Sequence, residues 1–195
     1  MNSLLDYDAD AGTATVQPGL VLAHLNRHLK SDGWWYPVDV STASRATLGG
    51  MAANNSCGSR SLRYGKMQDN VRALPAMTVD GTTRRFEYAD TTQALDADMH
   101  ALALKEQNEI TTRFPKVQRR VGGYNIDALL GDAPHIGHLL VGSEGTLALT
   151  KSIDLKLSPV LGTKTLGVCH FPTFYAAMDA AQHIVKLGPV AVELV

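Results

Sequence analysis

The stretch Ala46-Thr-Leu-Gly-Gly-Met-Ala-Ala-Asn-Asn-Ser-Cys-Gly-Ser-Arg-Ser-Leu-Arg-Tyr-Gly65 is unusually rich in small residues. It holds four glycines, two asparagines and two arginines, and it fits neither a regular helix nor a regular strand. Glycine lets backbone N–H groups approach a ligand and reach conformations that a Cβ forbids. The composition therefore predicts close contact between the main chain and a ligand, with tight structural turns as the alternative.

A second stretch of the same character is Val141-Gly-Ser-Glu-Gly-Thr-Leu147. Neither stretch has the G-x-G-x-x-G pattern of dinucleotide-binding units or the G-x-x-x-x-G-K-[ST] pattern of nucleotide triphosphatases. The residues alone thus indicate a phosphate or cofactor cradle of another kind, or a pair of structural turns.

Composition narrows the class of protein. The chain has 195 residues, a formal net charge of −1 and 19% charged residues. Its Lys and Arg residues form no basic stripe, which argues against a nucleic-acid partner. Cys57 and Cys169 lie far apart, which argues against a disulfide framework or zinc site and favours a reducing, cytoplasmic location. No signal peptide and no transmembrane segment is predicted, because no apolar run reaches about 20 residues.

Hydrophobic periodicity predicts an α+β chain. Leu95, Met99, Leu102 and Ile110 are expected on one face of a helix. A break at Ser158-Pro159 is followed by a second β-α-β pattern. The expected strands are 13–17, 71–79, 82–88, 147–157, 163–170 and 190–195, and the expected helices are 20–30, 92–113, 126–130 and 172–187.

Several motifs that occur in a fixed order along the chain indicate a particular protein family. The chain resembles the FAD-binding domain of the vanillyl-alcohol oxidase / p-cresol methylhydroxylase (PCMH) superfamily, in its D-lactate dehydrogenase and glycolate oxidase branch. The motifs are Val16-Gln-Pro-Gly19 with Leu25-Asn26, Pro37-Val-Asp39, Ala46 to Asn55, Gly58-x-x-Ser61-x-x-Tyr-Gly65, Asp69-x-Val71 and Gly142-Ser-Glu-Gly-Thr-Leu147. Val40 and Ala148 depart mildly from the family pattern, which often has Pro and Gly there.

The resemblance implies a fold and a domain organisation. Residues 1–159 would be the second α+β subdomain of a PCMH-type FAD-binding domain, and 160–195 the first β-α-β of a ferredoxin-like cap domain. The subdomain that opens the family's FAD domain and most of the cap are not found in this sequence. The chain is therefore expected to be an interior piece of the enzyme.

The resemblance also implies an activity. The cofactor would be FAD, and the enzyme would oxidise a small 2-hydroxy acid such as D-lactate, glycolate or 2-hydroxyglutarate by hydride transfer to flavin N5. The alternative is a truncated, non-catalytic α+β domain that binds flavin weakly or only with a companion segment. Such a domain could also associate with a second copy through an exposed strand edge.

The family pattern assigns candidate site residues. Arg120 and Tyr124, next to a Gly-Tyr-x-Leu-like segment, are weak catalytic candidates, with a solvated turn as the alternative. No metal ligand is assigned. The residues implied to contact FAD, mainly through their backbone, are Pro37, Asp39, Ser44, Arg45, Ala46, Thr47, Gly49, Gly50, Met51, Asn54, Asn55, Ser56, Gly58, Ser61, Tyr64, Gly65, Gly142, Ser143, Glu144, Gly145, Thr146 and Leu147.

Other residues have two interpretations each. Cys57 could carry a covalent flavin, but it is interpreted as a small packed thiol. Arg60 and Arg63 could pair with a pyrophosphate or carboxylate, or form surface ion pairs. Glu144 could be a general base, but a hydrogen bond to its own loop is favoured. The pairs His24/His28 and His135/His138 have spacings that permit a metal, but no third ligand accompanies them, which favours structural or exposed histidines.

Overall fold

Antiparallel strands form the centre of the molecule, and the computed structural model describes all residues from 1 to 195. The strands are β1 Leu4–Asp8, β2 Thr13–Val16, β3 Trp34–Trp35, β4 Val71–Met77, β5 Thr83–Phe86, β6 Leu149–Thr150, β7 Ile153–Lys156 and β8 Ser158–Pro159. The main sheet has the order β1-β2-β7-β4-β5, with β6 paired to β4, and β3 pairs separately with β8. The late strand β7 thus lies between two early ones.

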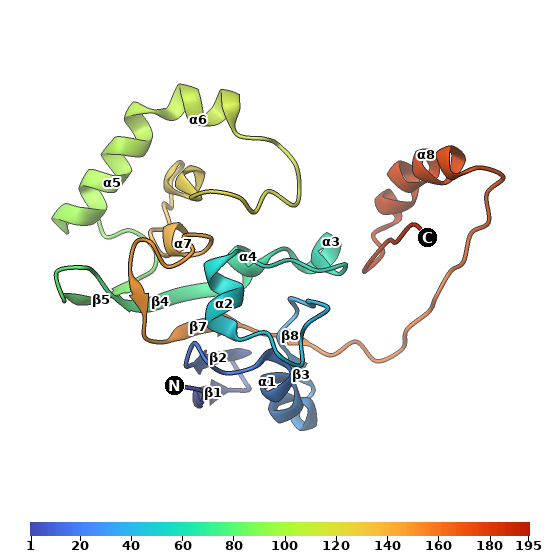
Figure 1. Cartoon of the computed structure of the whole chain (residues 1–195), viewed down its shortest axis with the longest axis horizontal. Helices are drawn as coiled ribbons and strands as arrows, with labels where there is room; N and C mark the ends of the chain where they lie inside the picture. The colour runs from blue at the N-terminus through green and yellow to red at the C-terminus, as the bar shows by residue number, and fades with distance from the viewer.

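Helices pack around this sheet, and α8 stands apart from it (Figure 1). The α-helices are α1 Leu22–Leu29, α2 Leu48–Ala53, α3 Ser61–Tyr64, α4 Met67–Asn70, α5 Ala94–Lys105, α6 Gln107–Arg113, α7 Gly137–Leu140 and α8 Phe174–Ile184. Three 3-10 helices complete the chain: η1 Lys30–Asp32, η2 Ile126–Leu129 and η3 Val185–Leu187.

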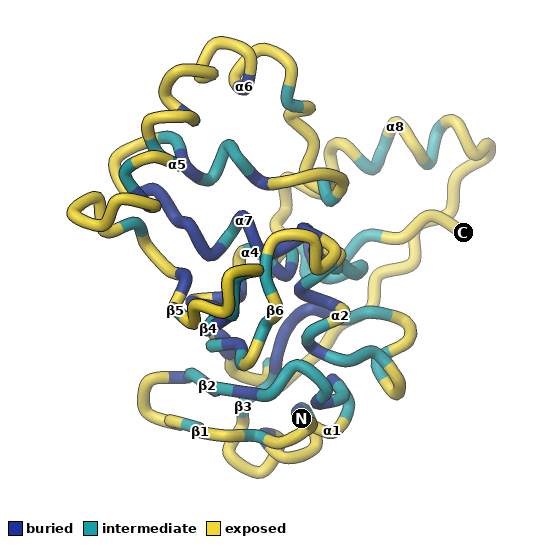
Figure 2. Tube along the Cα trace, turned by 60° about the vertical axis from the view of Figure 1, so that its left-hand side comes forward, coloured by how far each residue is buried: buried dark blue, intermediate teal, exposed yellow.

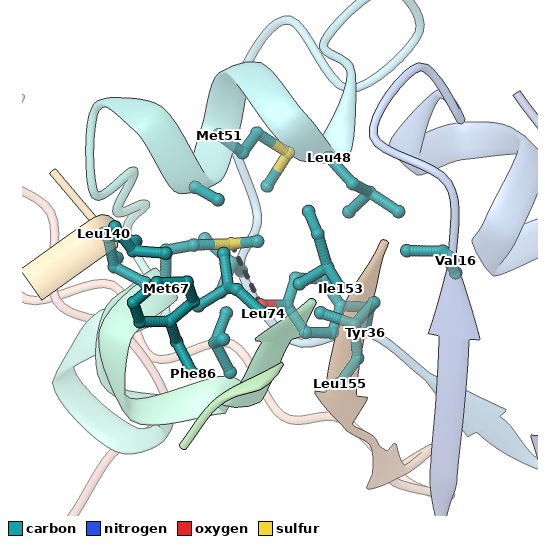
Figure 3. Packing of buried hydrophobic residues seen from close by; sticks show 14 of the residues in the cluster. Val16, Tyr36, Leu48, Met51, Met67, Leu74, Phe86, Leu140, Ile153 and Leu155 are labelled. Atoms are coloured by element: carbon teal, nitrogen blue, oxygen red, sulfur yellow. Dashed lines mark hydrogen bonds between the residues drawn. The ribbon is translucent and has the colours of Figure 1, made fainter. Parts of the chain in front are cut away.

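The hydrophobic core lies between the sheet and helices α1, α2 and α4 (Figure 3). Leu48 and Met51 anchor α2 in this core, and each is at most 2% exposed. The hydroxyl of the fully buried Tyr36 donates to Met67 Sδ at 2.9 Å. Burial of each large apolar side chain contributes about 1.5–3 kcal/mol. Burial of Leu48 and Met51 therefore fixes one side of α2 in the core, and the opposite side of the helix faces the surface.

Several predicted elements are confirmed. The strand predicted at 13–17 is β2, and the helix predicted at 20–30 is α1, whose buried residues are Leu22, Leu25 and Leu29. The predicted hairpin is β4 and β5, and Gly81 in its turn has φ +82°. The short helical segment predicted at 126–130 is η2.

The single helix predicted at 92–113 is wrong in extent, and its predicted buried face is confirmed only at Ile110, which is buried, and at Met99, which is half-buried against the core. Helices α5 and α6 replace it, with a break at Glu106. Leu95 and Leu102 are exposed, whereas Asp96 and Ala103 are buried. The physical reason is an ion pair between Asp96 and Arg84 of β5, with an N···O distance of 2.5 Å, which turns the carboxylate rather than Leu95 inward.

The strand prediction at 147–157 is confirmed only in part, and the two strands predicted near the C-terminus are wrong. Residues 147–157 hold the two separate strands β6 and β7. Segments 163–170 and 190–195 form no strand, although α8 does form within the predicted 172–187. A strand needs a paired neighbour to satisfy its backbone, and neither segment lies beside one. The β-α-β unit is therefore reduced to its helix.

The region beyond β8 lies at the end of a long extended connection (Figure 1) and is mostly exposed (Figure 2). Helix α8 has no buried residue. Its Thr173 cap is nevertheless well formed, since Thr173 Oγ1 accepts a hydrogen bond from Ala176 N at 3.1 Å. Helix α8 is therefore held by its own capping and backbone hydrogen bonds and not by packing on the sheet.

Candidate functional site

The two glycine-rich stretches meet in the folded chain. Gly142 N donates to Ala52 O at 2.8 Å, and Glu144 N donates to Ala53 O at 2.9 Å. The second stretch is thereby fastened to the C-terminal end of α2, whose other side is held in the core. Two segments far apart in sequence become one structural unit.

Unfavourable backbone conformations are concentrated at this junction. Asn55 (φ +49°) and Glu144 (φ +53°) are the non-glycine residues with positive φ in the chain. Gly142 and Gly145 have φ of +87° and +73°. Non-glycine residues pay of order 1–3 kcal/mol for such conformations, which are enriched at ligand sites. The strain marks this junction as a candidate site.

A cleft of about 270 Å³ opens where the two stretches meet. Most of its lining residues are small, so backbone forms much of its surface. This volume is slightly below the range of about 300–1,000 Å³ that is typical of ligand pockets. The cleft can therefore hold part of a large ligand. It is lined by Pro18, Gly49, Ala52, Ala53, Leu140, Ser143, Gly145, Ala148, Leu149 and Thr150.

Two buried asparagines at the junction have side-chain atoms without partners. Asn55 Oδ1 accepts from Gln68 N at 3.0 Å, but Asn55 Nδ2 has no acceptor. Asn125 Nδ2 donates to Val141 O at 2.7 Å, but Asn125 Oδ1 has no donor. Buried polar atoms are rarely left unpaired. The junction thus contains one unpaired buried donor and one unpaired buried acceptor, although neither asparagine lines the cleft.

Several glycines of the first stretch serve the protein's own structure. Gly49 N donates to Pro18 O at 2.7 Å, and Gly50 N donates to Thr47 Oγ1 at 3.3 Å, which caps α2. These two N–H groups are therefore engaged within the protein. Cys57, Ser59 and Gly145 instead have N–H groups that donate to no acceptor in the chain.

Asp39 organises the turn that follows the asparagines. Its Oδ1 accepts from Arg60 N at 3.1 Å, and its Oδ2 accepts from Ser59 Oγ at 3.2 Å and pairs with Arg60 Nε at 3.4 Å. A Cβ on Gly58 would collide with the carbonyl and carboxylate oxygens of Asp39. Of the two interpretations of Arg60, the structure has the ion pair. Its guanidinium also lies 4.9 Å from the ring centroid of Trp35.

The two catalytic candidates lie in different surroundings. Tyr124 Oη is 2.8 Å from Thr146 Oγ1, so Tyr124 joins the second glycine-rich stretch. Arg120 forms two hydrogen bonds to Asp127, at 2.6 and 2.5 Å, and lies 4.8 Å from the ring centroid of Phe114. Arg120 is therefore committed to a protein carboxylate.

The remaining predicted site residues occupy three kinds of position. Pro37, Met51, Ser61, Gly142 and Ser143 are buried. Ser44, Arg45, Gly50, Asn54, Glu144, Gly145, Thr146 and Leu147 are exposed. The half-buried ones are Asp39, Ala46, Thr47, Gly49, Ser56, Gly58, Tyr64 and Gly65.

Sequence reasoning missed Asn125 and most of the cleft lining, namely Pro18, Ala52, Ala53, Leu140, Ala148, Leu149 and Thr150. Pro18 lines the cleft, and Asn125 places its amide beside Gly142. The nearest sequence signals were the Pro-Gly turn at 18–19 and the Gly-Gly-Tyr run that precedes Asn125. The hydrogen bond predicted from Glu144 to its own loop is not found, because its backbone N–H donates to Ala53 O at the end of α2.

The histidines and cysteines are arranged as follows. His135 and His138 stack with ring centroids 3.7 Å apart, and His24 is exposed. Burial lowers the pKa of His138 to about 4, and burial also lowers the pKa of His135. No group of three or more His, Cys, Asp or Glu side chains converges as a metal site. Cys57 and Cys169 are both free thiols.

Comparison with known proteins indicates the family. A family model described as an FAD binding domain matches residues 1–87, which include the first glycine-rich stretch. Residues 1–87 are therefore similar to this FAD-binding family, and the similarity to the relatives below extends over the whole chain. Its FAD-binding domain is homologous to 2-hydroxy-acid dehydrogenases, and its cofactor is FAD.

Relatives of this FAD-binding chain carry related names. It is 30% identical to a D-2-hydroxyglutarate dehydrogenase of Pantoea ananatis, over 100% of the chain and 20% of that protein. It is 29% identical to a probable mitochondrial D-lactate dehydrogenase of Danio rerio, over 98% of the chain and 31% of that protein. A glycolate oxidase subunit of Bacillus subtilis is 29% identical over 99% of the chain and 34% of its own length. The chain thus spans about a fifth to a third of these relatives.

Proposed function

We propose that this chain forms one wall of the FAD site of an enzyme that oxidises a small 2-hydroxy acid. The observation that carries the proposal is the junction of the two glycine-rich stretches around a cleft of about 270 Å³. The substrate class comes from the names of the relatives, which act on D-2-hydroxyglutarate, D-lactate or glycolate.

The residues present fit an FAD molecule at this junction. Small side chains at Gly49, Ala52 and Ala53 leave room for a flat or extended ligand. Asn55 Nδ2 and Asn125 Oδ1 are an unpaired donor and an unpaired acceptor at the same junction, outside the lining of the cleft. When bound, FAD supplies the capacity to accept a hydride from the α-carbon of the 2-hydroxy acid. The chain's own residues bind and orient the cofactor.

Residues 1–159 are proposed as the FAD-binding part and residues 160–195 as the start of a cap domain. Pairing of β8 with β3 supports this boundary, because Trp35 pairs with Ser158 and Trp34 pairs with Pro159. Residues after β8 leave the sheet and become exposed. The hydrogen bond from Val160 N to Gly33 O, at 2.8 Å, holds the chain to this part of the fold just before it becomes exposed.

A second candidate function is a domain that binds FAD only with a companion segment. The observation in its favour is the apolar surface of α8, where Phe174, Tyr175 and Met178 are 63%, 79% and 52% exposed. A partner or second copy covering this surface would complete the assembly. No helix of the chain is long and apolar enough to cross a membrane. We also propose a cytoplasmic location, which the free Cys57 and Cys169 support.

Titration of the purified chain with FAD tests the proposal. Saturable binding, followed by quenching of flavin fluorescence, is expected for the unaltered chain. Ala53→Leu would fill the cleft, and Ala101→Leu on the exposed side of α5 is its control. The first variant is expected to weaken FAD binding about 10-fold, equivalent to 1.4 kcal/mol, and the control is expected to leave it unchanged.

The outcomes separate the two candidates. Loss of the visible flavin band on anaerobic addition of D-lactate, glycolate or D-2-hydroxyglutarate would support the oxidation step. Absence of saturable FAD binding by the chain alone would favour the candidate that needs a companion segment. Equal FAD affinity of the Ala53→Leu and Ala101→Leu variants would contradict the placement of the cofactor in this cleft.

A further inference from the structure

A second cleft, of about 310 Å³, lies between the end of α6, the loop that follows it and the start of α4. It shares no lining residue with the cleft at the glycine-rich junction. Its lining combines cations with apolar side chains, whereas the first cleft is lined by small residues. It is lined by Lys66, Ile110, Thr111, Phe114, Pro115, Lys116, Val117, Arg120, Asp127 and Leu130.

This cleft is held open by contacts between its loop and the first glycine-rich stretch. Arg119 donates to Gly58 O at 2.9 Å, and Gln118 Nε2 donates to Ser61 O at 3.2 Å. Lys66 Nζ donates to Arg120 O at 3.0 Å. Because these bonds fix the loop from one side, the cleft exists without a ligand to shape it.

The charges in the cleft do not balance. Arg120 and Asp127 neutralise each other, with a closest N···O distance of 2.5 Å. Lys66 is half-buried, and neither it nor Lys116 has a carboxylate within 4.0 Å. The Lys66 ammonium has three donors and uses one of them on a carbonyl oxygen. An unpaired cation in a partly enclosed site favours an anionic ligand.

The apolar residues of the lining favour an anion with a carbon chain over an inorganic anion. Ile110 is buried, Phe114 and Leu130 are half-buried, and Val117 is exposed. An inorganic anion would leave these groups in contact with water. A molecule with a carboxylate at one end and a carbon chain at the other would satisfy both parts of the cleft.

We propose that this cleft binds a small monocarboxylate with an apolar body, with its carboxylate at Lys66 and its carbon chain against Phe114 and Val117. The site is separate from the FAD wall, and its occupancy does not depend on bound FAD. Its position on the loop that is hydrogen-bonded to Gly58 and Ser61 links it physically to the first glycine-rich stretch.

The test is a titration of the full chain with hexanoate, followed by amide chemical shifts in two-dimensional NMR. Saturable shifts are expected for amides of residues 110–120 and for Lys66. Hexan-1-ol, which lacks the charge, and inorganic phosphate, which lacks the chain, are expected to bind at least about 10-fold more weakly. Equal affinity for phosphate and hexanoate would contradict a site that needs an apolar body.

Matched variants connect the binding to the cleft. Lys66→Met keeps the apolar stem and removes the charge, and Lys66→Arg restores the charge. Val117→Asp places a like charge beside the ligand, with Val79→Asp as its control, since both valines are exposed, at 62% and 104%.

Lys66→Met and Val117→Asp are each expected to lower hexanoate affinity about 10-fold, whereas Lys66→Arg and Val79→Asp retain it. Hexanoate binding that is unchanged in Lys66→Met and Val117→Asp would overturn the proposal. If Lys66→Met does not fold, Val117→Asp against Val79→Asp decides alone. Because FAD is absent from every titration, failure here is distinguishable from failure of the proposed FAD site.

Discussion

Asn55 lies against Gly142 so closely that a Cβ added to the glycine would be 3.3 Å from the Asn55 Cβ. Both residues have positive φ, at +49° and +87°. This contact joins the end of α2 to the second glycine-rich stretch. It is reinforced by the hydrogen bond from Gly142 N to Ala52 O. The candidate FAD wall therefore depends on a close approach of two backbones that leaves little room for a side chain.

Gly142→Ala is expected to destabilise the protein by about 1–2 kcal/mol, because it adds both a strained φ and a close contact. Chemical denaturation measures the free energy of unfolding. Gly81→Ala, with φ +82° and open space around it, isolates the conformational part of the cost. Gly122→Ala, with open space and no positive φ, should change nothing. Equal stabilities of the Gly142 and Gly122 variants would refute the argument.

Gly58→Ala is expected to cost at least about 2 kcal/mol of stability, since the new Cβ would collide with the backbone and carboxylate of Asp39. The 58–61 turn would have to move, and FAD affinity should fall with it. Thermal unfolding and FAD titration measure the two effects. Gly162→Ala, where nothing lies within 4 Å, is the control. An unaltered unfolding temperature of the Gly58 variant would show that Asp39 does not fix the turn.

Asp127→Ala is expected to destabilise the protein by about 2 kcal/mol, because it leaves the Arg120 guanidinium, 12% exposed, without its carboxylate. The matched exposed pair is Arg113–Glu109, whose side chains are 78% and 64% exposed. Glu109→Ala should cost only about 0.3 kcal/mol. Urea denaturation compares the two variants. Similar costs for both would mean that burial of Arg120 does not strengthen its ion pair.

Stability is expected to fall as the pH is lowered from about 6.5 to about 4. Burial lowers the pKa of His138 to about 4, and it is the first cause of the lowered pKa of His135. The unfolded chain therefore binds protons that the folded chain does not, and in this window the free energy of unfolding decreases with falling pH. For His138 the full effect is about 3 kcal/mol.

Urea denaturation at several pH values measures this dependence. The charged groups around the pair are Glu87 near His135, and Asp69 and Asp127 near His138, and all three oppose the depression of the pKa values. His138→Gln should flatten the pH dependence, whereas His24→Gln at an exposed position should retain it. A steep dependence that persists in His138→Gln would assign the effect to other groups.

Local patterns predicted the elements whose own sequence dictates them. The spacing of Leu22, Leu25 and Leu29 predicted α1, and Asp80-Gly81 predicted the turn between β4 and β5. The glycine-rich stretches predicted a place of close backbone approach, and the order of motifs predicted the FAD-binding family. These features are encoded within a few consecutive residues, so a single sequence is sufficient to find them.

Contacts between distant segments decided the rest. The Arg84–Asp96 ion pair rotated α5 away from the face that its leucines predicted. Segments 163–170 and 190–195 have strand-like sequences but no neighbouring strand, and so they stay unpaired. Gly49 N was expected to donate to a ligand, but it donates to Pro18 O within the protein. The unpaired amide atoms of Asn55 and Asn125 can be identified only from the contact between the two stretches. The sequence by itself determined the composition of the candidate site, and only the tertiary structure decided which of its polar groups remain free, because a hydrogen bond between residues far apart in the chain leaves no local pattern.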